Sequence, residues 1–94
     1  MKKFAWNIEK NNQLIEERGI SFERVIRQIE QNKILDVIKH PNTLKYPNQK
    51  IFILDIGSYA YLVPFVETEA EIFLKTIIPS RKASKKYLGV SHGQ

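Results

Sequence analysis

The apolar positions at the start of the chain follow a helical period after a short predicted strand, residues 3–6. Asn7 is a good N-cap for a first helix, which should end near Arg18 because Gly19 supplies a C-terminal signal. Ser21 can cap a second helix. The apolar residues of this helix fall at i, i+3, i+4 and i+7 and form one core-facing stripe: Phe22, Val25, Ile26 and Ile29.

The second half of the chain alternates short apolar runs with turn residues. Residues 40–49 contain two prolines and several Asn and Gln residues, which predicts a loop. Residues 50–56, 59–66 and 72–78 are predicted strands, and the tight turns between them favour antiparallel hairpins. Pro64 interrupts the second of these strands, which indicates an edge position or a bulge.

The order of predicted elements is typical of an α+β fold. Residues 34–38 fit either a short strand or a helix-to-loop transition, and Ser80 can cap a final helix after Pro79, over residues 81–88. We therefore expect a short strand, two helices, a three-stranded antiparallel sheet and a basic C-terminal helix. The strands are apolar on both faces, so we expect the first two helices on one face and the last helix or a partner on the other.

The length of 94 residues allows one domain, which we assign to residues 1–88, with a flexible tail at residues 89–94 that contains His92. Cysteine is absent, which excludes disulfides, thiolate metal sites and cysteine nucleophiles. With only two histidines we expect no metal and no cofactor. The apolar runs end well before the roughly 20 residues of a membrane span, and no signal peptide is visible. These features predict a cytoplasmic protein with no membrane partner.

The net charge of +5 is concentrated at one end of the chain. Residues 1–71 contain 10 cationic and 10 acidic side chains, whereas residues 72–94 contain five cations and no acid. A localised basic segment is the footprint expected of a polyanion site. The alternative is a solvated basic helix that only aids solubility. The five cations are Lys75, Arg81, Lys82, Lys85 and Lys86.

Three segments resemble motifs of the BrnT-type ribonuclease toxins. Residues 4–10, FAWNIEK, are similar to the F-x-W-D-x-x-K opening of that family, with Asn7 in place of the usual Asp. Residues 19–23, GISFE, resemble its H-G-V-S-F-E-E segment. Residues 76–84, TIIPSRKAS, resemble its I-I-S-A-R-x-A-T run, and Tyr87 resembles the tyrosine that follows.

This resemblance implies a RelE/ParE-like fold, with a small antiparallel sheet and helices packed on it. It also implies a bacterial toxin of a type II toxin–antitoxin pair, which arrests growth by cutting RNA and is silenced by a cognate antitoxin. The antitoxin would be of the ribbon–helix–helix type, and the RNA could be ribosome-associated mRNA. An antitoxin would be expected to cover the basic surface with acidic or apolar residues.

RNA cleavage without a metal needs a group that orients or deprotonates the 2′-OH, cations that stabilise the phosphorane, and an acid for the leaving 5′-oxygen. Arg81 is the main candidate for the charge role, because its planar guanidinium can hold two phosphate oxygens and the resemblance places a family arginine there. The alternative is an ion pair with Asp55 or Glu71. Three lysines would hold the RNA backbone around the scissile bond: Lys82, Lys85 and Lys86.

The remaining catalytic candidates have ordinary structural alternatives. His40 can carry protons near neutral pH, but its loop position is also typical of a surface histidine. Tyr87 could donate a proton or stack on a base, or pack its ring against the sheet. Lys75 could contact phosphate, as lysines do in RelE-like toxins, or protect a strand edge. Trp6 and Tyr46 could be RNA stacking platforms, although Trp6 also fits a core.

Three functions therefore compete. The first is a metal-independent endoribonuclease under antitoxin control. The second is a non-enzymatic module on the same fold, which would use the basic helix to hold a nucleic acid or an acidic protein. The third is a gyrase poison of the ParE type, which shares the fold and does not cut RNA.

Overall fold

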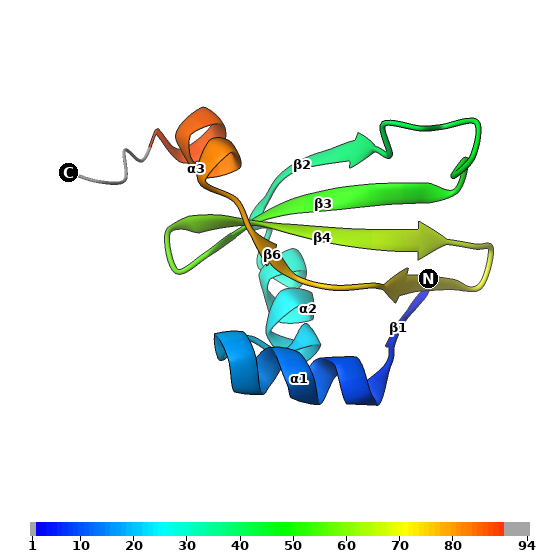
Figure 1. Ribbon diagram of the computed structural model, residues 1–94, viewed down its shortest axis with the longest axis horizontal. Coiled ribbons are helices and arrows are strands. Elements are labelled where there is room, and N and C mark those ends of the chain that lie inside the picture. Colours follow the sequence, from blue (N-terminus) through cyan, green and yellow to red (C-terminus); the bar gives the residue numbers. More distant parts are fainter. Residues whose placement is uncertain (1, 90–94) are drawn as a thin grey trace.

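The computed structural model describes residues 2–89 and has the α+β architecture that the sequence predicts (Figure 1). The predicted tail lies outside the described residues except for Gly89, which caps the last helix, and His92 is not among them. The elements are β1 (Lys3–Trp6), α1 (Ile8–Arg18), α2 (Phe22–Glu30), β2 (Ile34–Lys39), β3 (Gln49–Ile56), β4 (Tyr59–Glu67), β5 (Glu71–Leu74), β6 (Ile78–Pro79) and α3 (Arg81–Leu88).

The sheet is six-stranded and mixed, so the prediction of a three-stranded antiparallel sheet is wrong. Its main strands lie in the order β1-β5-β4-β3-β2, with β6 paired to one end of β4. β1 and β2 both join it, and β1 runs parallel to β5. Turn residues predict only pairing between neighbours in the chain. The β1–β5 pairing joins segments separated by most of the chain, and only the packed fold brings them together.

The last predicted strand, residues 72–78, is divided in the structure. β5 ends at Leu74, and the chain then leaves the sheet until β6 begins at Ile78. Between them, Ile77 turns into the core and is fully buried. The apolar pattern of residues 72–78 is the same for a continuous strand and for this detour, so it could not distinguish them.

Pro64 lies in the central strand β4 and not at an edge of the sheet. Its carbonyl oxygen accepts the N–H of Lys75 at 2.8 Å. In an antiparallel strand the nitrogen and the carbonyl oxygen of one residue point to the same side, so the ring nitrogen of Pro64 faces the side where β5 has left the sheet. On the other side, Pro64 is opposite Ile51 of β3. The missing N–H of proline therefore costs little at this position.

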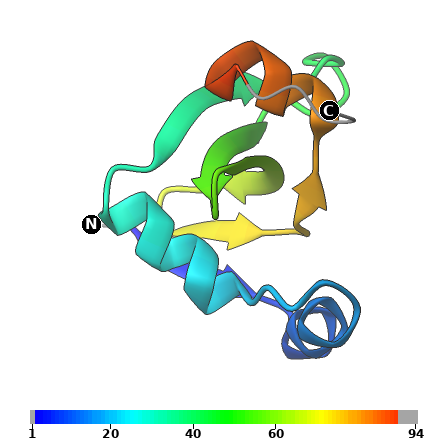
Figure 2. The same ribbon diagram turned by 90° about the vertical axis from the view of Figure 1, so that its left-hand side faces the viewer.

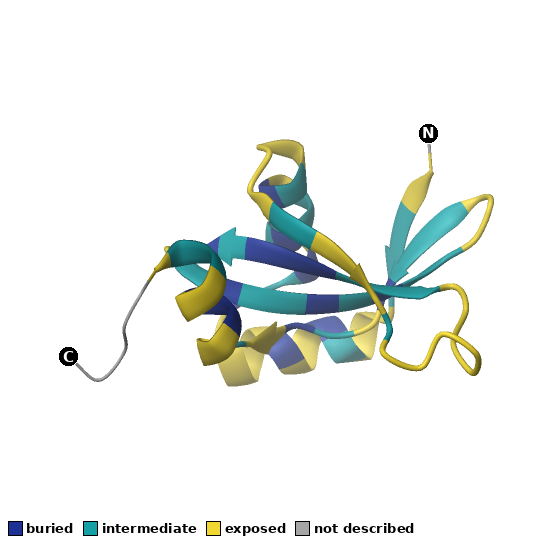
Figure 3. Cartoon of the chain, turned by 90° about the horizontal axis from the view of Figure 1, so that it is seen from above, coloured by how far each residue is buried: buried dark blue, intermediate teal, exposed yellow. Residues whose placement is uncertain are grey.

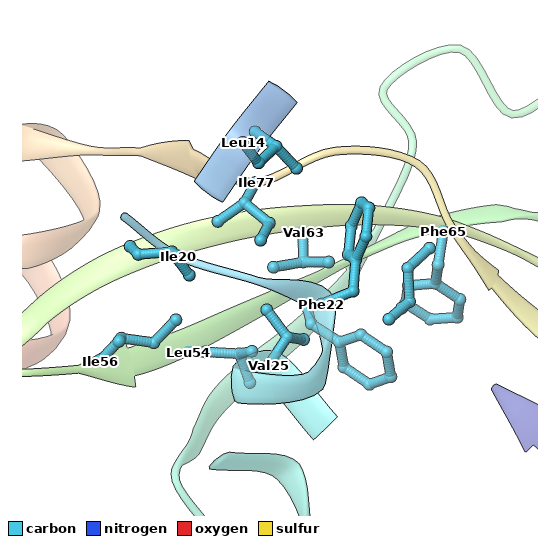
Figure 4. Close-up of a cluster of buried hydrophobic side chains, with 11 residues drawn as sticks. Leu14, Ile20, Phe22, Val25, Leu54, Ile56, Val63, Phe65 and Ile77 are labelled. Atoms are coloured by element: carbon cyan, nitrogen blue, oxygen red, sulfur yellow. The ribbon is translucent and has the colours of Figure 1, made fainter. Parts of the chain in front are cut away.

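The main core lies between the sheet and the first two helices. Figure 4 shows side chains of α1, α2 and the strands converging in this layer. Phe52 of β3 stacks on Phe65 of β4 with ring centroids 4.1 Å apart. Two buried polar side chains fix the helices. Asn11 accepts the backbone N–H of Phe22 at 2.7 Å, and Gln28 donates to the carbonyl oxygen of Asp55 at 2.6 Å.

α3 covers part of the opposite face of the sheet (Figure 2). Its Ala83 packs against Ile53 of β3 and Ala60 of β4, which form a second, smaller core. The expectation that the last helix covers this face is therefore confirmed at this end of the strands. In the part of the chain that the structure describes, no helix has the length and apolarity to cross a bilayer.

Candidate functional site: a groove beside the basic helix

α3 is held on the sheet by a small hydrogen-bonded cluster. Ser80 caps the helix by accepting the N–H of Ala83 at 3.0 Å, and its own N–H donates to the carbonyl oxygen of Ala60. Ser84 is fully buried, and its hydroxyl accepts the N–H of Ala60 at 2.8 Å while donating to the carbonyl oxygen of Ser80. These bonds continue the ladder of β4 beyond the end of β6. They fix which side of α3 faces the sheet.

A groove with a volume of ≈ 190 Å³ lies between α3 and the sheet. We call it the α3 groove. Its sheet side is apolar and comes from β2, β3 and β4, whereas its helix side carries two lysines and a tyrosine. The lining residues are Ile38, Ile53, Leu62, Ser80, Lys82, Ala83, Lys86 and Tyr87.

Tyr87 and Asp36 form a polar contact at the groove. The Tyr87 hydroxyl donates to Oδ2 of Asp36 at 2.7 Å, and the other carboxylate oxygen, Oδ1, accepts the backbone N–H of Val37 at 2.8 Å. The hydrogen bond from Tyr87 is the largest cause that lowers the pKa of Asp36, followed by the bond from Val37, and the charge of Lys86 acts in the same direction. Asp36 is therefore ionised at neutral pH.

The cations of α3 have no carboxylate partner within the described residues. Within the described range of residues, 2–89, the only ion pairs are those of Lys2 and Lys50 with Glu67. The alternative pairing of Arg81 with Asp55 or Glu71 is therefore not formed. Figure 3 shows that much of the surface of α3 is exposed, and all four of its cations are: Arg81, Lys82, Lys85 and Lys86. The helix thus presents four cations that form no ion pair within the described residues.

The structure places three of the predicted site residues together in the groove, with two more on the same helix. Lys82 and Lys86 line it with Tyr87, and the ammonium of Lys86 lies 5.1 Å from the centroid of the Tyr87 ring. Arg81 is exposed in the first turn of α3, and Lys85 lies one turn further along. Four of the five cations of the basic segment are thus gathered on one short helix.

His40 and Tyr46 lie elsewhere. His40 follows β2, four residues beyond Asp36, which is roughly 13 Å along an extended strand. Its Nδ1 accepts the N–H of Asn42, and its ring packs against Tyr46 with centroids 4.5 Å apart. The histidine therefore belongs to the loop after β2 and not to the α3 groove.

Lys75 and Trp6 are also outside the groove. The prediction that Lys75 lies within a strand is wrong. Lys75 follows directly after β5, where it is exposed and donates its N–H to the carbonyl oxygen of Pro64. Trp6 is half-buried on β1 and packs against Phe22 of α2, with ring centroids 6.0 Å apart. It faces the helix-side core, on the opposite side of the sheet from α3. The structure thus gives Trp6 a packing role.

Asp36 is the site residue that the sequence analysis missed. It is the only acid between residues 31 and 54, and it interrupts the apolar run ILDVI. A lone carboxylate in such a run is a signal that it has a partner. The identity of that partner could not be read from the sequence, because Tyr87 lies 51 residues away.

The site is suited to binding anionic groups. Its charged groups are lysines and an arginine that can hold phosphates or carboxylates, with one phenol held in place by a carboxylate. Among residues 2–89, no three His, Asp or Glu side chains gather as a metal site would require. Comparison of the chain with protein-family models, curated proteins and solved structures finds no match.

Proposed function

We propose that this chain is the toxin of a type II toxin–antitoxin pair and cuts RNA at the α3 groove without a metal ion. The observation that carries the proposal is the set of four α3 cations that form no ion pair in the described part of the chain, beside a groove that also holds Tyr87. Phosphate contacts supply most of the affinity of such surfaces for nucleic acids. The motif resemblance points to the same helix.

The architecture supports a RelE/ParE-like fold for this toxin. Two helices lie on one face of the sheet, and the basic helix lies on the other (Figure 2). The strands from β2 to β5 are joined by antiparallel pairing, as the resemblance implies. The parallel strand β1 adds to that core arrangement.

The proposed chemistry is attack of the RNA 2′-oxygen on the adjacent phosphorus. A new O2′–P bond forms and the P–O5′ bond breaks, while the 2′-OH gives its proton to a water molecule and the 5′-oxygen takes one from an acid. Arg81 and the lysines stabilise the extra negative charge of the phosphorane. Tyr87 is the candidate proton donor for the 5′-oxygen, and its hydroxyl must turn from Asp36 to the substrate to act, because Asp36 accepts its only proton in this structure.

The test is growth after induction of the wild-type chain and of Arg81→Ala, with total RNA probed for cleavage in the same cultures. Arg18→Ala is the matched control, because Arg18 is also exposed but lies at the end of α1. We expect arrest and RNA cleavage with the wild type and with Arg18→Ala, and neither with Arg81→Ala. Arrest with intact RNA would instead favour a gyrase poison. A ribbon–helix–helix reading frame beside the gene would support an antitoxin.

One observation favours the non-enzymatic binding module. The only imidazole within the described residues, His40, is roughly 13 Å along the strand from Asp36, so the groove lacks the residue most often used for proton transfer. If induction leaves growth and RNA unchanged while the purified chain still binds RNA, the chain is a binding module of this kind.

A further inference from the structure

Among the strands that the structure describes, β1 is an outer one and is bordered only by β5. The N–H of Lys3 donates to the carbonyl oxygen of Ala70, so the backbone groups of Lys3 and, two residues on, of Ala5 point towards β5. Successive residues of a strand point these groups to opposite sides, so those of Phe4 and Trp6 point away from β5. β1 therefore presents outward N–H and C=O groups with which another strand could pair.

An apolar pocket of ≈ 250 Å³ opens along the same strand. Its lining comes from three residues of β1 and the first residue of α1: Phe4, Ala5, Trp6 and Ile8. Ile8 is 72% exposed, although its side chain is apolar. Proteins that bind an added strand use the open backbone for affinity and pockets beside it for the side chains of that strand. β1 has both features, and we call this combination the β1 edge.

The two outer strands of the sheet differ in how well they are protected from such pairing. Proteins protect outer strands with bulges, prolines or charged side chains. β2 has a register shift between Ile34 and Asp36, which is a device of this kind. β1 has no proline, and its register with β5 is continuous from Lys3 to Trp6. Its single charged residue, Lys3, lies at its start, so the rest of the β1 edge is open to a partner strand.

The sequence of β1 is complementary to a second copy of itself. When two β1 strands run antiparallel with Ala5 opposite Ala5, each Phe4 lies opposite Trp6 of the other copy, and every outward backbone group of these residues gains a partner. The Ala5 pair lies on the axis, where the backbones approach to about 4.5 Å between Cα atoms and a methyl group fits. The rings of Phe4 and Trp6 lie next to each other across the strands, a favourable cross-strand pair.

The charges at the two ends of β1 also match in this register. Lys3 of one copy comes opposite Asn7 of the other, beside the first turn of α1, which contains Glu9. Lys3 and Glu9 are both exposed, and neither forms an ion pair within residues 2–89. The antiparallel pairing therefore brings a cation of one copy towards an acid of the other at both ends of the strands.

We propose that two copies of the chain join through the β1 edge into a two-fold symmetric dimer with one continuous sheet. The contact uses the same strand of both copies, so it closes after two chains. The symmetry axis of such a pair is perpendicular to the sheet, so both α3 helices lie on the same face. Where the proposed function holds, on which this clause rests, one RNA strand can contact both α3 grooves and gain avidity. The dimer itself does not depend on that function.

The first test is sedimentation equilibrium of the full chain between about 1 µM and about 1 mM, a range that covers weak and moderate dissociation constants. We expect a monomer–dimer equilibrium for the wild type and loss of the dimer in Ala5→Glu and in Ala5→Lys, since like charges then face each other on the axis. An equal mixture of these two variants should form a dimer again. Thr43→Glu and Thr43→Lys are the matched controls and should dimerise as the wild type does, because Thr43 is exposed in the loop after β2, the opposite outer strand.

A disulfide test reports the register directly. The chain has no cysteine, so Ala5→Cys introduces a single thiol. Residues that face each other in a pair without backbone hydrogen bonds have the Cα separation that a disulfide requires. We expect mild oxidation to convert Ala5→Cys into a disulfide-linked dimer under conditions that leave Thr43→Cys monomeric.

Four results would overturn the proposal. A wild type that is monomeric at about 1 mM would show that a second copy does not occupy the β1 edge. A dimer that persists in Ala5→Glu and Ala5→Lys would place the interface elsewhere. A mixture of these variants that stays monomeric, while circular dichroism shows both to be folded, would exclude the contact at Ala5. Equal cross-linking of Ala5→Cys and Thr43→Cys would exclude the register. None of these measurements involves RNA, so this inference and the proposed function can fail independently.

Discussion

The phenol of Tyr87 donates a 2.7 Å hydrogen bond to the carboxylate of Asp36 and so joins α3 to the edge strand β2. This contact makes the docking of the basic helix sensitive to acid. The Tyr87 hydroxyl is the main cause that lowers the pKa of Asp36 below its ordinary value of 3.8. Removal of that hydroxyl should therefore change how stability depends on pH.

We expect Tyr87→Phe to be less stable than the wild type, with a difference that is largest above pH 3.8, the ordinary pKa of Asp. A carboxylate whose pKa is lowered by folding stabilises the protein while it is ionised in both states. The difference should therefore shrink as the pH falls through 3.8 and then through the lower pKa of folded Asp36. Urea unfolding of both chains at a series of pH values measures this. A difference that is constant over the acid range would contradict the link to Asp36.

Other carboxylates also make the chain acid-sensitive, so the comparison must be made between variants. The hydrogen bond from Asn11 lowers the pKa of Glu23, and Lys2 and Lys50 lower that of Glu67. Both effects are present in the wild type and in Tyr87→Phe. They cancel in the difference between the two chains, which leaves the part that belongs to Asp36.

Ser84→Ala should destabilise the chain by about 1–3 kcal/mol, the cost of leaving a buried hydrogen-bonding group without a partner. The Ser84 hydroxyl is the acceptor for the N–H of Ala60, and alanine cannot replace it. Lys85→Ala is the control, because Lys85 is the exposed neighbour on the same helix, and it should change stability by no more than about 0.5 kcal/mol. Equal unfolding midpoints for the two variants in urea would show that this hydrogen bond does not stabilise α3.

Asn11→Ala should cost a similar amount, about 1–3 kcal/mol, through the connection between α1 and α2. The side chain of Asn11 accepts the buried N–H of Phe22 and donates to Glu23 at 3.0 Å. Its exposed neighbour Asn12 provides the control Asn12→Ala. Thermal unfolding followed by circular dichroism compares them. The prediction fails if both variants melt at the temperature of the wild type.

The proposed binding of RNA should depend steeply on salt concentration, and the lysines of the groove should set part of that dependence. For single strands the logarithm of affinity falls with the logarithm of salt concentration by about 0.7 for each phosphate contact. Lys82→Gln and Lys86→Gln should each reduce the slope by about that amount. Lys3→Gln, on the outer strand β1, should leave it unchanged. The measurement is the dissociation constant of a single-stranded RNA at several KCl concentrations, and equal slopes for all chains would remove α3 from the RNA site.

The helix ends could be predicted from the sequence because they depend on adjacent residues. Asn7 accepts the N–H of Lys10, and Ser21 caps α2 in the same way. Gly19 ends α1 with a φ of 69°, a left-handed conformation that glycine adopts without steric cost. Such caps need only a few neighbouring residues in the right order, and the sequence contains them.

The parts that could not be predicted depend on distant contacts. The detour between β5 and β6 occurs because Ile77 packs into a core built by other elements. The hydrogen bond between Asp36 and Tyr87 exists only once α3 lies on the sheet beside β2. The positive charge of α3 was visible in the sequence. The apolar side of the groove beneath it was not, because the sequence does not show which residues of β2, β3 and β4 lie beside α3.

The hydrogen bond from the Val37 N–H to Asp36 also affects whether two copies of the chain can pair through β2. β2 is an outer strand with Val37 and Ile38 exposed, and such an edge can recruit a strand from another molecule. In the observed register the N–H of Val37 points away from β3, towards solvent, and Oδ1 of Asp36 already accepts it. An incoming strand would have to displace that carboxylate before it could pair. The residue that anchors the basic helix therefore also opposes strand pairing at this point of the β2 edge. Light scattering of Asp36→Ala against the wild type should show this protection as faster aggregation of the variant.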